Sequence, residues 1–151
     1  MPPKKPAAKK AAPAASPLID TLNDLRAREL AVIVQYMRHH YTITGADGVA
    51  LADEFKETAI TEMKHAEELA ERIDFLGGDP TTIPTSIVKT DNNLAAMAEA
   101  DLASEEEAVM LYTKAIAEAL KAGDVTTRRL LESILADEED HVATFRAMLG
   151  K

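Results

Sequence analysis

Apolar residues recur along most of the chain at alternating steps of three and four positions, the spacing that gathers them on one face of an α-helix. Four such stretches are separated by segments that contain glycine and proline. They predict four long helices, at about 17–44, 48–76, 91–123 and 124–149. Because helices of this kind bury their apolar faces against one another, we expect an all-α four-helix bundle over residues 17–150.

Residues at the ends of these stretches carry helix start and stop signals. Ser16 followed by Pro17 is typical of a helix N-terminus, and Asp47 and Asp124 can cap the second and fourth helices. The segment 79–90 holds two prolines and three threonines and is not expected to be helical. Extended chain of this length can run along a whole bundle and would set the second and third helices parallel. The expected topology is an antiparallel bundle with a long crossover between helices 2 and 3.

One glutamate interrupts the apolar face of each predicted helix. A buried, unpaired carboxylate is costly, so such groups are normally paired or bound to a metal. The second and fourth helices each add a histidine three residues after the glutamate, on the same face. All four glutamates lie near the middle of their helices, so they converge whichever way each helix runs. The residues of this predicted cluster are Glu29, Glu62, His65, Glu105, Glu138 and His141.

The donor set of the cluster indicates a pair of metal ions. Oxygen and nitrogen ligands without sulfur suit iron or manganese, and four carboxylates balance the charge of two divalent ions. A glutamate from each of two helices and Glu-x-x-His from each of the other two is the pattern of di-iron carboxylate bundles. We expect each metal ion to bind one histidine and one terminal glutamate, either Glu29 or Glu105. Glu62 and Glu138 would then bridge the two ions.

Three further residues on the first helix lie near the predicted cluster. Tyr36 follows Glu29 by two turns on the same face. Its hydroxyl either reaches the metal ligands or belongs to a core tyrosine with another hydrogen-bond partner, and both interpretations stay open. His39 continues this face and is expected to be a buried, hydrogen-bonded histidine instead of a ligand. His40 is expected to face solvent.

The first 16 residues differ in composition from the rest of the chain. They are rich in Lys, Pro and Ala, and the prolines block a stable helix, so we expect a disordered basic tail. Such a tail either acts as a solubilising segment or touches DNA phosphates non-specifically. The net charge is −9, and it is −13 without the four lysines of the tail. The body is therefore acidic and attracts cations.

The residue inventory also limits the classes of protein to consider. There is no cysteine, which excludes disulfides, thiolate zinc sites and iron–sulfur clusters. No run of about 18 apolar residues predicts a membrane helix, and the N-terminus lacks the apolar centre of a signal peptide. We expect a cytoplasmic protein without a membrane partner.

The motifs around the cluster resemble those of the bacterioferritins. The matching stretches fall within residues 18–149 and are Arg28-Glu29-Leu30, Gln35-Tyr36, Glu62-Met63-Lys64-His65-Ala66, Glu71-Arg72-Ile73, Phe75-Leu76, Asp101-Leu102-Ala103 and Asp137-Glu138-Glu139. The resemblance implies a ferritin-like bundle with two iron ions per subunit, a ferroxidase that oxidises Fe(II) to Fe(III) with O2 or H2O2. It also implies assembly from dimer units into a hollow cage that stores ferric mineral.

The resemblance extends to a candidate haem site. Met63 matches the methionine by which bacterioferritins hold haem b between two subunits, one thioether from each. The alternative is a methionine that packs at a dimer contact.

Two features depart from the bacterioferritin pattern. Ten residues follow His141, so no fifth helix is expected. The basic tail is similar to that of the Dps mini-ferritins, which form twelve-subunit shells and can bind DNA. A DNA-associating mini-ferritin that protects against oxidative stress is therefore one alternative to storage in a twenty-four-subunit cage. A di-iron peroxidase or oxygenase without storage, built as a dimer, is another.

Overall fold

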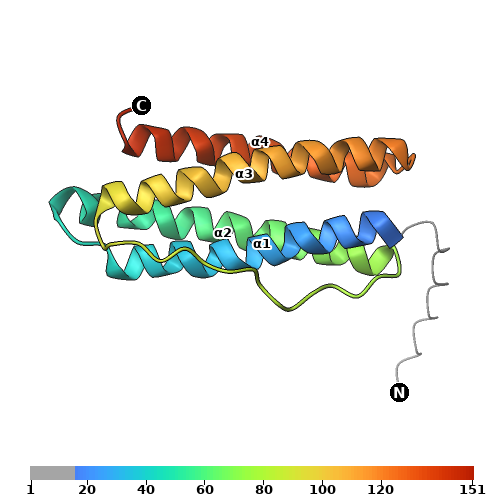
Figure 1. Cartoon of the computed structure of the whole chain (residues 1–151), viewed down its shortest axis with the longest axis horizontal. Helices are drawn as coiled ribbons and strands as arrows, with labels where there is room; N and C mark the ends of the chain where they lie inside the picture. The colour runs from blue at the N-terminus through green and yellow to red at the C-terminus, as the bar shows by residue number, and fades with distance from the viewer. Residues whose placement is uncertain (1–15) are drawn as a thin grey trace, which may run out of the picture.

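The amphipathic stretches fold into four long α-helices, which make up most of residues 16–151, the part of the chain that the computed structural model describes. The helices are α1 Ser16–Thr42, α2 Ala46–Phe75, α3 Leu94–Lys121 and α4 Val125–Met148. In Figure 1, α1 and α2 form one hairpin, α3 and α4 form a second, and the two hairpins lie side by side. The predicted all-α four-helix bundle is confirmed. The predicted tail lies outside the described residues except for Ser16, the first residue of α1.

The crossover between α2 and α3 runs back along the bundle beside α1 (Figure 1). Its residues 78–91 are neither helix nor strand. The backbone N–H of Thr85 donates to the carbonyl of Ala27 at 3.0 Å, and the N–H of Val88 donates to the side chain of Gln35 at 2.7 Å. The crossover therefore returns the chain to the end at which α2 begins, and α3 runs parallel to α2 as predicted.

Two of the predicted helix starts are wrong. Asp47 does not cap α2 but lies inside its first turn, because the chain turns at Gly45, whose φ of 88° is a left-handed conformation that favours glycine. α3 begins later than predicted, because the side chain of Asn93 caps it by accepting a hydrogen bond from the N–H of Ala96 at 3.0 Å. Asp124 caps α4 as predicted.

The apolar core is divided into two clusters, one toward each end of the bundle. The first is built by the N-terminal halves of α1 and α4 with the C-terminal halves of α2 and α3, and the second by the opposite halves. Between them, every helix places a glutamate in the interior. The two apolar clusters hold the helices together on both sides of a polar centre.

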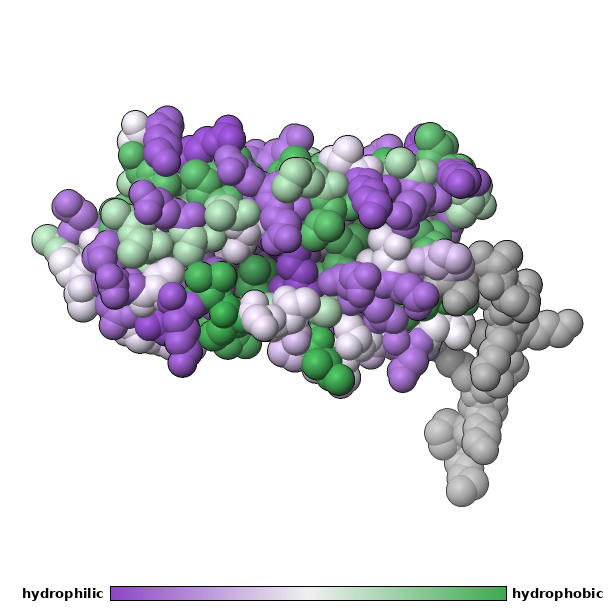
Figure 2. Space-filling model, viewed as in Figure 1, coloured by the Kyte–Doolittle hydropathy of each residue, from purple (hydrophilic) through white to green (hydrophobic). Residues whose placement is uncertain are grey.

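The outer surface mixes polar and apolar side chains. Figure 2 shows hydrophilic and hydrophobic residues interleaved over the face that carries the crossover, whose Ile83 and Val88 are exposed. None of the four described helices has the length and apolar character that crossing a membrane requires.

Candidate metal centre

Four carboxylates and two imidazoles meet between the two apolar clusters. Each helix supplies the glutamate that interrupts its apolar face, and α2 and α4 each add the histidine one turn later. All six are buried: Glu29, Glu62, Glu105 and Glu138 have no exposed surface, His65 is 2% exposed and His141 is 9% exposed. The structure therefore brings together all six residues of the predicted cluster.

The six residues divide into two groups of four, each with its ligand atoms within 4.8 Å of one another. Glu62 and Glu138 belong to both groups. Glu29 and His65 complete the first group, which we call the His65 half. Glu105 and His141 complete the second, the His141 half. These two shared glutamates are the pair predicted to bridge two ions.

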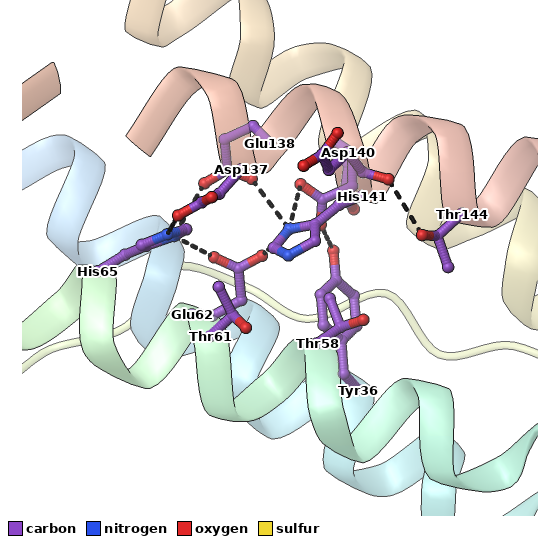
Figure 3. A network of polar contacts seen from close by, with 12 residues as sticks. Tyr36, Thr58, Thr61, Glu62, His65, Asp137, Glu138, Asp140, His141 and Thr144 are labelled. Atoms are coloured by element: carbon purple, nitrogen blue, oxygen red, sulfur yellow. Dashed lines mark hydrogen bonds and ion pairs between the residues drawn. The ribbon is translucent and has the colours of Figure 1, made fainter. Parts of the chain in front are cut away.

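The two histidines turn the same ring nitrogen toward the shared carboxylates (Figure 3). Nδ1 of His65 lies 2.8 Å from Oε2 of Glu62 and 3.2 Å from Oε1 of Glu138. Nδ1 of His141 lies 2.9 Å from Oε1 of Glu62 and 3.6 Å from Oε2 of Glu138. Each imidazole thus directs one nitrogen to both carboxylates and leaves the other free for an outer partner.

Burial and the histidines give the shared and the terminal glutamates opposite pKa shifts. Burial raises the pKa of Glu29 and of Glu105 well above the ordinary value of a glutamate. Burial also acts to raise the pKa of Glu62 and Glu138, but the imidazoles of His141 and His65 outweigh it, and both pKa values fall below the ordinary one. The shared pair is therefore ionised at neutral pH.

The histidines carry the matching positive charges. Burial acts to lower the pKa of His65, but the carboxylates of Glu138 and Glu62 outweigh it and raise this pKa to about 11. The same opposing causes raise the pKa of His141 to about 9. In the metal-free centre, two imidazolium groups therefore face the two shared carboxylates.

Several polar atoms of the centre are buried and make no hydrogen bond, although each lies within ion-pair distance of another group of the centre. They are Oε1 of Glu62, both carboxylate oxygens of Glu138 and Nδ1 of His141. Buried polar atoms nearly always make hydrogen bonds, so oxygens and nitrogens that gather at one point without them indicate a ligand-binding site. This donor set, without sulfur, fits a pair of iron ions.

Two tyrosines hold the terminal glutamates crosswise. The hydroxyl of Tyr36 on α1 donates to Oε1 of Glu105 on α3, and the hydroxyl of Tyr112 on α3 donates to Oε1 of Glu29 on α1 at 2.5 Å. Tyr36 therefore reaches the centre, which resolves the two interpretations left open by the sequence. Tyr112 was not predicted to have this role. The sequence does contain a signal for this role, because both tyrosines follow a terminal glutamate by seven residues, which places them on the same face of the helix.

Arg28 is a further residue of the centre that was not predicted to lie there. Its side chain is buried, with Nη1 3.1 Å from Oε2 of Glu29 and Nη2 3.3 Å from Oε2 of Glu105. Nη2 also donates to the carbonyl of Ser104 at 2.7 Å. Burial acts to lower the pKa of Arg28, but Glu29 and Glu105 outweigh it and raise this pKa. No helical periodicity signals Arg28, which lies beside the apolar face of α1.

The remaining predicted residues lie outside the cluster. His39 is fully buried and its Nδ1 lies 2.8 Å from Oδ2 of Asp101, as expected of a hydrogen-bonded core histidine. The prediction that His40 faces solvent is wrong, because it is half-buried and its Nδ1 lies 2.9 Å from the carbonyl of Ala52 on α2. Met63, one residue after Glu62, points outward and is 52% exposed.

Comparisons with known proteins agree with this architecture. A family model described as Ferritin-like domain matches residues 19–151. A bacterioferritin from Desulfovibrio desulfuricans is 38% identical over 128 residues, covering 85% of this chain and 72% of that protein. Its X-ray structure, described as having a diiron site in different catalytic states, has a TM-score of 0.84 at 36% identity and covers 89% of this chain and 79% of that chain.

Two other similar proteins carry different descriptions. A nutrient stress-induced DNA-binding protein from Synechococcus is 32% identical over 144 residues, covering 87% of this chain and 82% of that protein. The bacterioferritin-related protein from Bacteroides fragilis, described as a dodecameric thioferritin, has a TM-score of 0.85 at 27% identity. The match covers 93% of this chain and 88% of that chain.

Proposed function

Because this chain belongs to the ferritin-like domain family and is related to the bacterioferritins, we propose that it is an iron-oxidising and iron-storing protein with a di-iron ferroxidase centre. Its substrate would be Fe(II), its oxidant O2 or H2O2, and its product ferric mineral held in an oligomeric shell. The observation that carries this proposal is the pair of four-residue groups that share Glu62 and Glu138.

The proposed ligands divide as the two groups do. One Fe(II) would bind Glu29 and His65, the other Glu105 and His141, and the shared carboxylates of Glu62 and Glu138 would bridge them. Two Fe(II) supply two electrons, the number that reduces O2 to H2O2 or H2O2 to water. The iron pair supplies this redox chemistry, and the chain supplies geometry, charge and access.

The protein groups around the ligands prepare the site for cations. Binding requires both histidines to lose the protons that they hold in the metal-free centre, so iron would take over the role of the two imidazolium charges. The hydroxyls of Tyr36 and Tyr112 hold Oε1 of the two terminal glutamates. Oε2 of each glutamate is not held by a tyrosine and lies beside Arg28. An acidic body, with a charge of −13 apart from the four lysines of the tail, favours the approach of Fe(II).

Aerobic titration of metal-free protein with Fe(II) tests the proposal. We expect a fast increase in ferric absorbance that saturates near two iron ions per chain, followed by slower uptake into a large particle on a sizing column. E62A should abolish the fast phase while helical content by circular dichroism stays near that of the wild type. E106Q removes an exposed carboxylate of α3 and is the matched control.

The outcome separates storage from other di-iron chemistry. Saturation at two iron ions with a small particle and no further uptake would favour a dimeric peroxidase or oxygenase without storage. A fast phase that persists unchanged in E62A would exclude the cluster as the ferroxidase centre. If the large particle forms, the similarity to the Bacteroides fragilis protein described as dodecameric supports a shell of twelve subunits over a cage of twenty-four.

Association with DNA is a second candidate function. It is favoured by the similarity to the Synechococcus protein named for DNA binding and by Lys4, Lys5, Lys9 and Lys10 in the predicted tail. Lysine contacts to phosphates weaken steeply with salt. We expect DNA retention in a gel at low salt that disappears above about 0.2 M salt and on deletion of residues 1–15. Equal retention by the deleted chain would exclude the tail.

Haem binding by Met63 also stays a prediction. The exposed thioether is accessible to a group shared with a second subunit. Haem b added to the chain should give a low-spin absorption spectrum that M63L lacks. M110L, which changes an exposed methionine of α3, is the control, and a spectrum that M63L leaves unchanged would exclude this ligand.

A further inference from the structure

The two halves of the centre are matched in almost every contact. The ligands of α1 and α2 each have a counterpart 76 positions later in α3 or α4: Glu29 has Glu105, Glu62 has Glu138 and His65 has His141. The two terminal glutamates each accept a hydrogen bond from a tyrosine, and Arg28 lies 3.1 Å from one and 3.3 Å from the other. The contacts of the two terminal glutamates are thus closely similar, apart from a distance of 4.0 Å between Nδ1 of His141 and Oε2 of Glu105.

The outer nitrogen of the two histidines is where the halves differ. Nε2 of His65 lies 3.0 Å from Oδ2 of Asp137 on α4 (Figure 3). Counted back by 76, the counterpart of Asp137 is Thr61 on α2, whose hydroxyl donates to the carbonyl of Glu57 in its own helix at 3.3 Å. Within residues 16–151, no carboxylate outside the cluster forms an ion pair with His141.

A carboxylate on the outer nitrogen of a metal-binding histidine has two effects. It accepts a hydrogen bond from the N–H of that nitrogen, which orients the ring and leaves the opposite nitrogen as the ligand atom. It also makes that ligand nitrogen more basic. His65 has this partner, and its Nδ1 is held toward Glu62 and Glu138. His141 presents the same Nδ1, but among the described residues no carboxylate pairs with its outer nitrogen.

We propose that Asp137 makes the two halves unequal, so that the His65 half binds its divalent ion first and more tightly and the His141 half holds the more exchangeable ion. Asp137 acts through His65 and is a positioning residue, half-exposed at the edge of the centre. The inference rests on the proposed function, which requires two ions in this cluster.

Calorimetric titration of the metal-free full chain with Co(II) tests the inference. We expect two ions per chain with separable affinities. D137N should weaken the tighter site about tenfold or more, the usual effect of removing such a partner, and change the weaker site less than about threefold. D140N, on the same helix and exposed, removes the same charge without a contact to His65 and should match the wild type.

Three further variants show which histidine belongs to which Co(II) site and whether a new carboxylate can strengthen the weaker one. H65A should abolish the tighter site and H141A the weaker one. T61D places a carboxylate at the position related to that of Asp137 and should tighten the weaker site. Because a gain at one site cannot come from general loss of structure, T61D distinguishes positioning from folding, and circular dichroism checks that each variant is helical.

Each outcome bears on one proposal. Two sites of equal affinity in the wild type, a D137N titration that matches that of D140N, or a folded T61D variant with an unchanged weaker site would overturn the inference and leave the di-iron centre standing. Fewer than two Co(II) per chain in the wild type would instead contradict the proposed function.

Discussion

At the scale of single residues, Arg28 brings a fixed positive charge to a site proposed to bind cations. Four carboxylates with neutral imidazoles balance two Fe(II) ions, and the guanidinium adds one charge beyond that balance. In the metal-free centre, the Arg28 guanidinium forms ion pairs with Glu29 and Glu105. Metal binding therefore competes with ion pairs that the fold already contains.

Replacing Arg28 by methionine keeps much of its apolar volume and removes its charge. Without metal, the free energy of unfolding of R28M should be about 3 kcal/mol lower than that of the wild type, because two buried carboxylates lose their partner. Its affinity for Co(II) should rise, since no cation then competes for the terminal glutamates. Urea unfolding and Co(II) titration measure the two effects. R129M, at an exposed arginine of α4, is the control, and a Co(II) affinity that falls in R28M would contradict the competition.

At the scale of the helices, Asp124 connects the start of α4 to α2. Its carboxylate accepts hydrogen bonds from the backbone N–H and the hydroxyl of Thr127, at 2.9 Å and 2.6 Å. It also pairs with Nη2 of Arg72, in the last turn of α2, at 2.8 Å. One side chain thus caps one helix and joins it to another.

The D124A variant should lower the free energy of unfolding by about 1–2 kcal/mol at pH 7, the cost of a lost helix cap. Burial acts to raise the pKa of Asp124, but Thr127 and Arg72 outweigh it and hold this pKa below its ordinary value. The stabilisation is therefore present above about pH 4 and is lost as the pH falls.

Urea unfolding of metal-free D124A and wild type at pH 7 and at pH 3 measures this dependence. The difference between the two proteins should shrink at the lower pH. D140A, an exposed position inside α4, should differ little from the wild type at either pH. A difference that is the same at both pH values would show that the charge of Asp124 does not contribute.

At the scale of the whole molecule, the centre joins the two hairpins through buried charge. The α1–α2 hairpin contributes Glu29, Glu62 and His65, and the α3–α4 hairpin contributes Glu105, Glu138 and His141. Without metal, the hairpins are joined there by imidazolium–carboxylate pairs. With metal, ions bound to residues of both hairpins would replace those pairs. The effect of metal on the free energy of unfolding should therefore depend on pH.

Metal-free protein should lose stability as the pH rises above neutrality. The pKa of His141 is raised to about 9 and that of His65 to about 11. A raised histidine pKa contributes stability that is complete below about pH 6.5 and is lost as the pH rises through the folded-state pKa. The melting temperature should therefore fall between pH 6.5 and 9, and H141Q should show a smaller fall.

Co(II) should have the opposite pH dependence, because the ion binds the deprotonated imidazoles. Its stabilisation should grow with pH and reach about 2.7 kcal/mol when free Co(II) is about 100 times its dissociation constant. Chelation should remove it. Melting curves at a series of pH values, with and without Co(II), measure both dependences. A melting temperature of metal-free protein that stays constant from pH 6.5 to 9 would contradict the pKa argument.

The crossover was predicted from the prolines and the length of segment 79–90, whereas helical periodicity predicted the four-helix bundle and the six residues of the cluster. These features depend on spacing within one helix, since residues three and four apart share a face. Glu62 and His65 could therefore be placed side by side before any packing was known. The cap at Asp47, the start of α3 and the exposure of His40 were predicted wrongly. Each depends on the detail of one turn or on a contact between different helices.

The partners of the cluster required the packing of one helix against another. Arg28 reaches Glu105 across the bundle, Tyr112 reaches Glu29, and Asp137 reaches His65, and in each pair the residues come from different hairpins. The sequence determined which face of each helix is buried, because that follows from the periodicity of a single helix. Which side chains meet across the interior depends on the rotation and axial offset of neighbouring helices, and the packing of the bundle sets both.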